Sequence, residues 1–61
     1  MNRTELDKKV EEKFASLNEF LDGDFVSMHE YPVDDPEFKR RSFRLYRLAT
    51  ELKLAIDEFE S

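Results

Sequence analysis

Cysteine is absent from this 61-residue sequence, and only one glycine is present. Without cysteine the chain has no disulfide, no thiolate metal ligand and no cysteine nucleophile. The single glycine, Gly23, excludes a glycine-rich phosphate-binding loop. A domain of this length buries only about 60% of the surface that its unfolded chain exposes. We therefore expect one domain, residues 1–61, that depends on good helix packing or on oligomerisation for its stability.

The sequence also lacks long apolar runs, since no apolar run in it approaches the roughly 20 residues needed to span a membrane. The first ten residues, MNRTELDKKV, lack the apolar core of a secretory signal. The absence of cysteine fits a reducing compartment. We therefore expect a cytoplasmic protein.

Groups that carry out catalysis or hold metals are sparse. His29 is the only histidine, and no serine or threonine has the local signature of an activated nucleophile. Carboxylates that could gather around a hard cation lie in the central part of the chain, at Asp22, Asp24, Glu30, Asp34 and Asp35. Their spacing does not match an EF-hand, because DGDFVSMHE has its glycine at the second position. We expect no enzymatic activity, no metal and no cofactor.

An apolar residue recurs every three or four positions near the start of the chain, at Leu6, Val10, Phe14, Leu17 and Leu21. This spacing predicts a helix with one apolar stripe over about residues 3–22. Two capping pairs suit its start, Asn2 with Glu5 and Thr4 with Asp7. Gly23 suits a left-handed residue that ends the helix.

The second half of the chain predicts a longer helix over residues 36–60. Asp35 suits the N-cap, Pro36 the first helical position, and Glu37 the positive end of the helix dipole. An apolar residue recurs every seven positions, with further apolar residues at its flanks: Phe38, Leu45, Leu52 and Phe59, with Leu48, Ala49, Ala55 and Ile56. The pattern predicts one broad stripe along the whole helix.

Two helices joined by a modest connection pack most simply as an antiparallel hairpin, so the sequence predicts an all-α fold. We expect residues 23–35 to form a loop over the end of this hairpin, with a short extended segment as the alternative. Antiparallel packing brings opposite charges together at both ends. It places Asp24 beside the basic start of the second helix, and it places the lysines of the first helix beside the acidic end of the second.

Some large apolar residues lie off the two stripes, at Phe20, Phe43, Tyr46 and Leu54. A lone hairpin leaves them in water, and contiguous exposed apolar area typically marks an interface. We therefore expect two hairpins to pair as a homodimeric four-helix bundle, with these residues at the oligomer or partner interface. The alternative is that the central segment, through Phe25, Met28 and Tyr31, covers them.

Charge is unevenly distributed along the chain. The net charge is −5, yet residues 36–47, PEFKRRSFRLYR, contain five basic residues and one acidic residue. Helical spacing places Arg40, Arg44 and Arg47 on one flank. This row is either a contact for RNA or DNA or a solvated flank paired with acidic groups of the same or a neighbouring chain. We favour the second interpretation, because a chain with a pI near 4.8 is a poor general binder of polyanions.

Two short stretches, DDPEF (34–38) and LATELKLAIDEF (48–59), resemble the second helix of the small sporulation-control aspartyl phosphatases. These are two-helix hairpins that act on a phosphorylated response regulator. Their signature reads Ser-Gln-Glu-Leu-Asp, where this chain has ATELK (49–53), so a lysine replaces the key acid. In outline, the expected fold also resembles the plasmid copy-control hairpins of the Rop type, dimeric bundles that bind paired RNA loops. We assign the chain to neither family.

These observations predict a small non-enzymatic protein–protein interaction or regulatory module that acts as a homo-oligomer, of the adaptor, antitoxin, or phage or bacterial inhibitor type. The alternative is a Rop-like RNA- or DNA-binding helical hairpin that uses the basic flank of residues 39–47. A third hypothesis is a phosphatase-like regulator that retains the carboxylate of Glu51.

Overall fold

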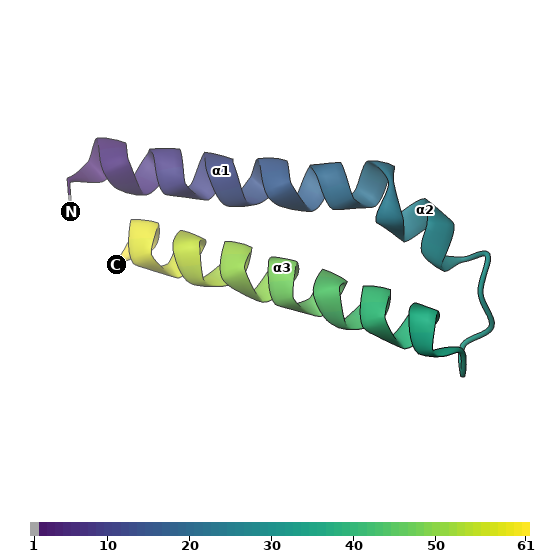
Figure 1. Ribbon diagram of the computed structural model, residues 1–61. Helices are drawn as coiled ribbons and strands as arrows, with labels where there is room; N and C mark the ends of the chain where they lie inside the picture. Colours follow the sequence, from purple (N-terminus) through teal and green to yellow (C-terminus); the bar gives the residue numbers. More distant parts are fainter. Residues whose placement is uncertain (1) are drawn as a thin grey trace.

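The computed structural model describes residues 2–61 and contains three helices (Figure 1). They are α1 (Arg3–Asp22), α2 (Asp24–Met28) and α3 (Pro36–Glu60), and no residue of 2–61 lies in a strand. The prediction of an all-helical chain is confirmed, and the bounds of the two long helices agree with those expected. The prediction of only two helices is wrong, because α2 lies between them.

Capping side chains fix where the long helices begin. The Asn2 side chain accepts a hydrogen bond from the Glu5 backbone N–H at 2.9 Å, so the cap of α1 is the first of the two expected pairs. The Asp35 side chain accepts from the Glu37 N–H at 2.8 Å, and Pro36 follows at the first helical position. Each cap satisfies an amide that the helix itself leaves without a partner.

Gly23 does not end α1 in the left-handed conformation that we expected. Its φ is −124° and its ψ is −82°, and its N–H donates to the Phe20 carbonyl oxygen at 3.2 Å. Its own carbonyl oxygen accepts from the Ser27 N–H at 3.1 Å, which begins α2. The chain therefore bends at Gly23 and continues as a helix (Figure 1). The expected loop over residues 23–35 is a short helix followed by turns.

The two long helices lie side by side and run in opposite directions, with both chain ends at one end of the molecule and α2 at the other (Figure 1). Ion pairs lie at both ends of the helix pair, as the charge pattern predicted. Lys9 Nζ of α1 lies 3.1 Å from Glu58 Oε2 of α3, and at the other end Arg44 Nη1 of α3 lies 3.4 Å from Asp24 Oδ2 of α2. The molecule is long and thin, with extents of 44 × 18 × 11 Å.

The core is small. Among residues 2–61, only Phe20, Met28 and Ala55 are buried. Phe14, which we assigned to the apolar stripe, is half-exposed, so the stripe is not buried along its whole width. The chain exposes 4812 Å², whereas a compact monomer of 7.3 kDa exposes only about 4,200 Å². No helix in residues 2–61 has the length and apolar character needed to cross a membrane.

Candidate functional site

The four residues predicted at an interface differ in where the structure places them. Phe43 and Tyr46 are 69% and 71% exposed, and Leu54 is more than half exposed. Their predicted exposure is confirmed. Phe20 is only 4% exposed, so the expectation that a single chain leaves it in water is wrong.

The burial of Phe20 has a geometric cause. Phe14 and Phe20 lie about 120° apart around α1, and the side of the helix that faces α3 is the Phe20 side. The Arg44 guanidinium from α3 lies over the Phe20 ring, 6.0 Å from its centroid. Helix α1 thus contacts α3 along its Phe20 side, next to the apolar stripe, and Phe14 on the far edge of the stripe stays outside the contact.

Because α1 turns its Phe20 side toward α3, an apolar face forms on one side of the plane that contains the two helix axes. On α1 the residues of this face lie about 60–120° around the helix from Phe20, and on α3 they lie at the same angles from Ala55. Both groups are on the same side of the plane because the helices are antiparallel. We call this set the apolar face: Val10, Phe14, Leu17, Leu21, Phe38, Leu45, Ala49, Leu52 and Ile56. All nine keep part of their surface exposed.

The opposite side of the plane is charged. Glu51 and Glu58 lie about 40–60° from Ala55 in the opposite rotational sense. Glu58 pairs with Lys9, and Glu51 Oε2 lies 3.5 Å from Lys13 Nζ. The other carboxylate oxygen of Glu51 lies 3.8 Å from Arg47 Nε. The Glu51 carboxylate is therefore engaged in ion pairs on the charged side of the molecule.

The outer edge of α3, away from α1, carries an open groove with mainly apolar walls. We call it the apolar groove: Val33, Phe38, Phe43 and Tyr46, with Lys39 and Ser42 at its border. Val33 comes from the turns between α2 and α3 and is largely exposed, as are Phe43 and Tyr46. Two elements of the chain therefore converge on one exposed apolar site.

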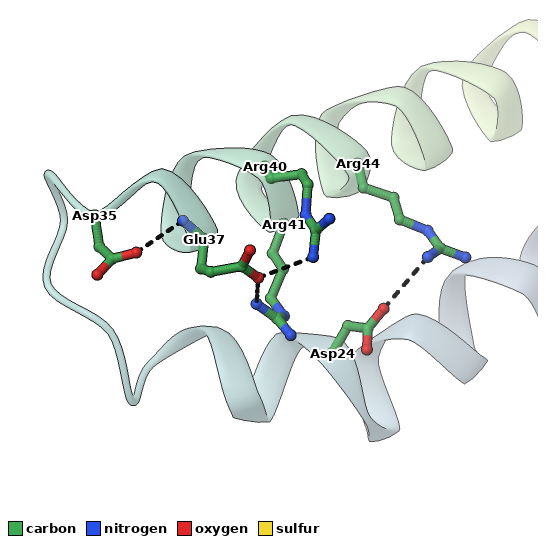
Figure 2. A network of polar contacts seen from close by, with 6 residues as sticks. All are labelled: Asp24, Asp35, Glu37, Arg40, Arg41 and Arg44. Atoms are coloured by element: carbon green, nitrogen blue, oxygen red, sulfur yellow. Dashed lines mark hydrogen bonds and ion pairs between the residues drawn. The ribbon is translucent and has the colours of Figure 1, made fainter.

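Beside this groove lies the arginine row, Arg40, Arg44 and Arg47, which lines a shallow hollow together with Phe43 and Asp24. Figure 2 shows the ion pairs at the start of α3: Glu37 Oε2 accepts from Arg40 at 2.9 Å, and Arg44 reaches Asp24. The structure thus brings the three predicted arginines together on one flank. Each also has an acidic partner within the chain, as expected for a paired, solvated flank.

Arg41 differs from the three arginines of the row, and no pattern in the sequence singled it out. Its Nη1 lies 2.5 Å from Glu37 Oε2, and its guanidinium lies over the Tyr31 ring at 5.1 Å (Figure 2). Burial alone would lower the pKa of Arg41. The hydrogen bond to Glu37 and the charges of Tyr31, Glu37 and Asp24 outweigh burial and raise the pKa above its ordinary value. Arg41 therefore stays charged and holds the turn after α2 against α3.

The remaining candidate groups do not form a site with evident chemistry. His29 Nδ1 lies 2.8 Å from the Phe25 carbonyl oxygen, and its ring packs edge-on against the Phe25 ring at 4.7 Å. No cluster of three or more histidine, cysteine, aspartate or glutamate residues that could hold a metal occurs between residues 2 and 61. The polar and apolar surfaces of α3 are therefore the candidate functional features.

No family model, no curated protein and no solved structure matches this chain. Neither of the two resemblances noted from the sequence is therefore carried further. A function has to be argued from the apolar face, the apolar groove and the arginine row.

Proposed function

We propose that the protein is a small non-enzymatic module that acts by binding another protein, and that it does so as a homodimer. The observation that carries this proposal is the surplus of exposed surface, together with six large apolar side chains among residues 2–61 that are more than half exposed. The chain exposes 4812 Å² in total, about 600 Å² more than a compact monomer of its mass, and this surplus is of the same order as the roughly 800 Å² that each partner buries in a standard protein interface.

The apolar face is the surface we assign to the dimer. Two flat molecules whose apolar faces stack give a four-helix bundle, in which each pair of helices provides the second layer that the other lacks. Leu45, Leu52 and Ile56 already lie partly covered beside α1, so stacking completes a core that the single chain only begins. The apolar groove lies on the outer edge of α3 and shares only Phe38 with the apolar face, so its Val33, Phe43 and Tyr46 remain free for another partner.

A charge in the apolar face should separate the dimer. We expect the wild-type protein to sediment at twice the chain mass of 7.3 kDa, and Leu52→Asp to sediment as a monomer with reduced helical circular dichroism, because an unpaired carboxylate would enter the bundle core. The matched control is Leu54→Asp, since this leucine lies two positions away, outside the apolar face, and is exposed. It should keep the wild-type mass and helicity.

Two outcomes would contradict the proposed dimer. A wild-type chain that sediments as a monomer at micromolar concentration and still unfolds cooperatively would show that it needs no second copy. Dissociation by Leu54→Asp but not by Leu52→Asp would move the interface to the charged side of the molecule.

Binding to RNA or DNA is the second candidate function. The observation in its favour is the arginine row, whose three arginines line one hollow together with the exposed Phe43. Such a contact would weaken steeply with salt, because phosphate neutralisation releases counterions. Against it, Asp24 and Glu51 stand at the borders of the row, where a longer polyanion would meet negative charge.

A further inference from the structure

We propose that the apolar groove and the arginine row together form one docking site for an acidic amphipathic helix of a partner protein. The inference rests on the proposed role as a protein-binding module and names the chemistry of its partner. Phe43 borders both features, since it lines the apolar groove and the hollow of the arginine row. We call the combined site the Phe43 surface.

The apolar part of the Phe43 surface supplies anchoring contacts. Phe43, Tyr46 and Val33 are among the most exposed large apolar side chains of the described residues, and they converge on a single groove. Phe43 and Tyr46 lie about 120–180° around α3 from Ala55, the residue buried against α1, so α1 does not cover them. Val33, in the turns before α3, is 73% exposed. Aromatic side chains in such a position carry most of the binding energy of many protein interfaces.

The basic part of the Phe43 surface selects the charge of the partner. Residues 36–47 contain five basic residues and one acidic residue in a chain whose net charge is −5. Arg40, Arg44 and Arg47 follow an i, i+4, i+7 spacing, so their row is about 10 Å long. Carboxylates at the same spacing on another helix would match it, and guanidinium groups bind carboxylates through paired hydrogen bonds.

The ion pairs within the chain do not block this docking. Arg40, Arg44 and Arg47 are each about two-thirds or more exposed and pair with Glu37, Asp24 and Glu51. Exposed pairs of this kind are worth only about 0–1 kcal/mol, so a partner carboxylate can replace them. Phe43 and Tyr46 then pack against the apolar stripe of the incoming helix, which is the helix-in-groove mode of recognition.

An acidic helix fits the site better than a nucleic acid does. The row is short and is bordered by Asp24 and Glu51, which would repel the phosphates of a strand that extends past it. The groove beside it has mainly apolar walls, with Lys39 and Ser42 only at its border, and such walls suit apolar side chains better than phosphate groups. Both features suit a partner whose negative charge is limited to one edge and whose adjacent stripe is apolar.

Fluorescence anisotropy with the 61-residue chain tests the proposal. The probe is a labelled helical peptide with glutamates at i, i+4 and i+7 along one edge and leucine and phenylalanine along the next stripe. The comparison probes are the same peptide with a scrambled order, the same peptide with lysine in place of glutamate, and a hairpin RNA. We expect the acidic amphipathic peptide to bind the most tightly of the four.

Variants of the Phe43 surface localise the binding. Phe43→Ala should weaken affinity for the acidic peptide about tenfold, and Arg44→Glu should weaken it at least as much because it reverses a charge in the row. Leu54→Ala, an equally simple truncation of an exposed side chain outside the groove, should leave the affinity unchanged. Sedimentation of Phe43→Ala as a dimer would show that its effect is on docking and not on assembly.

Three results would overturn the proposal: equal binding of the scrambled peptide, unchanged affinity of Phe43→Ala, or tighter binding of the RNA with a steep salt dependence. The last would instead assign the arginine row to a nucleic acid. A monomeric wild-type chain that binds the acidic peptide through Phe43 would contradict the proposed dimer and support the docking site, so the two proposals can fail separately.

Discussion

The two ends of the helix pair are built differently. At the α2 end, Phe20 and Met28 are buried, and Arg41 packs on Tyr31 while it pairs with Glu37. At the open end, where both chain ends lie, Ala55 is the only buried residue among those described. Beyond it, the Phe59 ring is covered by the Arg3 guanidinium, 4.6 Å from its centroid.

This difference shows what a third short helix contributes to a pair of long ones. α2 gives the long helices a second surface to pack against at one end, so aromatic and thioether side chains are removed from water there. At the open end, the helices contact each other through a small residue and through ion pairs such as Lys9 with Glu58. We therefore expect the α2 end to hold the stable part of the structure and the open end to open first.

Removing a large side chain from the α2 end should have the largest effect. Phe20→Ala should destabilise the chain by about 3–5 kcal/mol, and this is comparable to the entire stability that a domain of this size reaches from its core. We expect loss of the helical circular dichroism signal or a large drop in the urea midpoint.

Phe43→Ala is the matched control for this change, because it removes the same side chain from an exposed position. It should change the unfolding free energy by less than about 0.5 kcal/mol. Equal losses of unfolding free energy in the two variants would mean that the Phe20 side chain is packed no better than the exposed Phe43 side chain.

Local signals in the sequence predicted much of the fold. Asn2 and Asp35 carry short polar side chains at helix starts, and Pro36 fits only the first turn, so the helix bounds follow from residues within a few positions of each end. The exposure of Phe43 and Tyr46 also followed, because they lie far around α3 from its main stripe. The ion pairs between α1 and α3 followed from the antiparallel arrangement.

Features that depend on contacts between distant residues were not predicted. Which of Phe14 and Phe20 is buried depends on the rotation of α1 about its own axis relative to α3. A broad apolar stripe is compatible with several such rotations. The helix α2 spans only Asp24–Met28, too short for a helical period to be recognised. The bend at Gly23 depends on the packing of α2 on α3, so the local residue type alone suggested a different helix end.

The close approach of the helices at the open end depends on the smallness of Ala55. Its exposed fraction is 2%, so a larger side chain would push α1 and α3 apart or force strained rotamers. Ala55→Leu should destabilise the chain by about 1–3 kcal/mol, measured by urea denaturation. The control is Ala15→Leu on the exposed side of α1, which should be nearly neutral. Stabilisation by Ala55→Leu would show that the open end is underpacked rather than tightly closed.

The two helix caps give the finest test of the difference between the ends, because they have the same chemistry in different surroundings. Asp35 caps α3 at the α2 end and is partly buried, whereas Asn2 caps α1 at the open end and is exposed. Asp35→Ala should cost about 1 kcal/mol of unfolding free energy. Asn2→Ala should cost less unfolding free energy. The open end already opens locally before the whole chain unfolds, so its cap adds little to global stability.

Amide hydrogen exchange should show increased opening of the first turn of α1 in Asn2→Ala with little change elsewhere. A larger loss of stability from Asn2→Ala than from Asp35→Ala would reverse the order of the two ends.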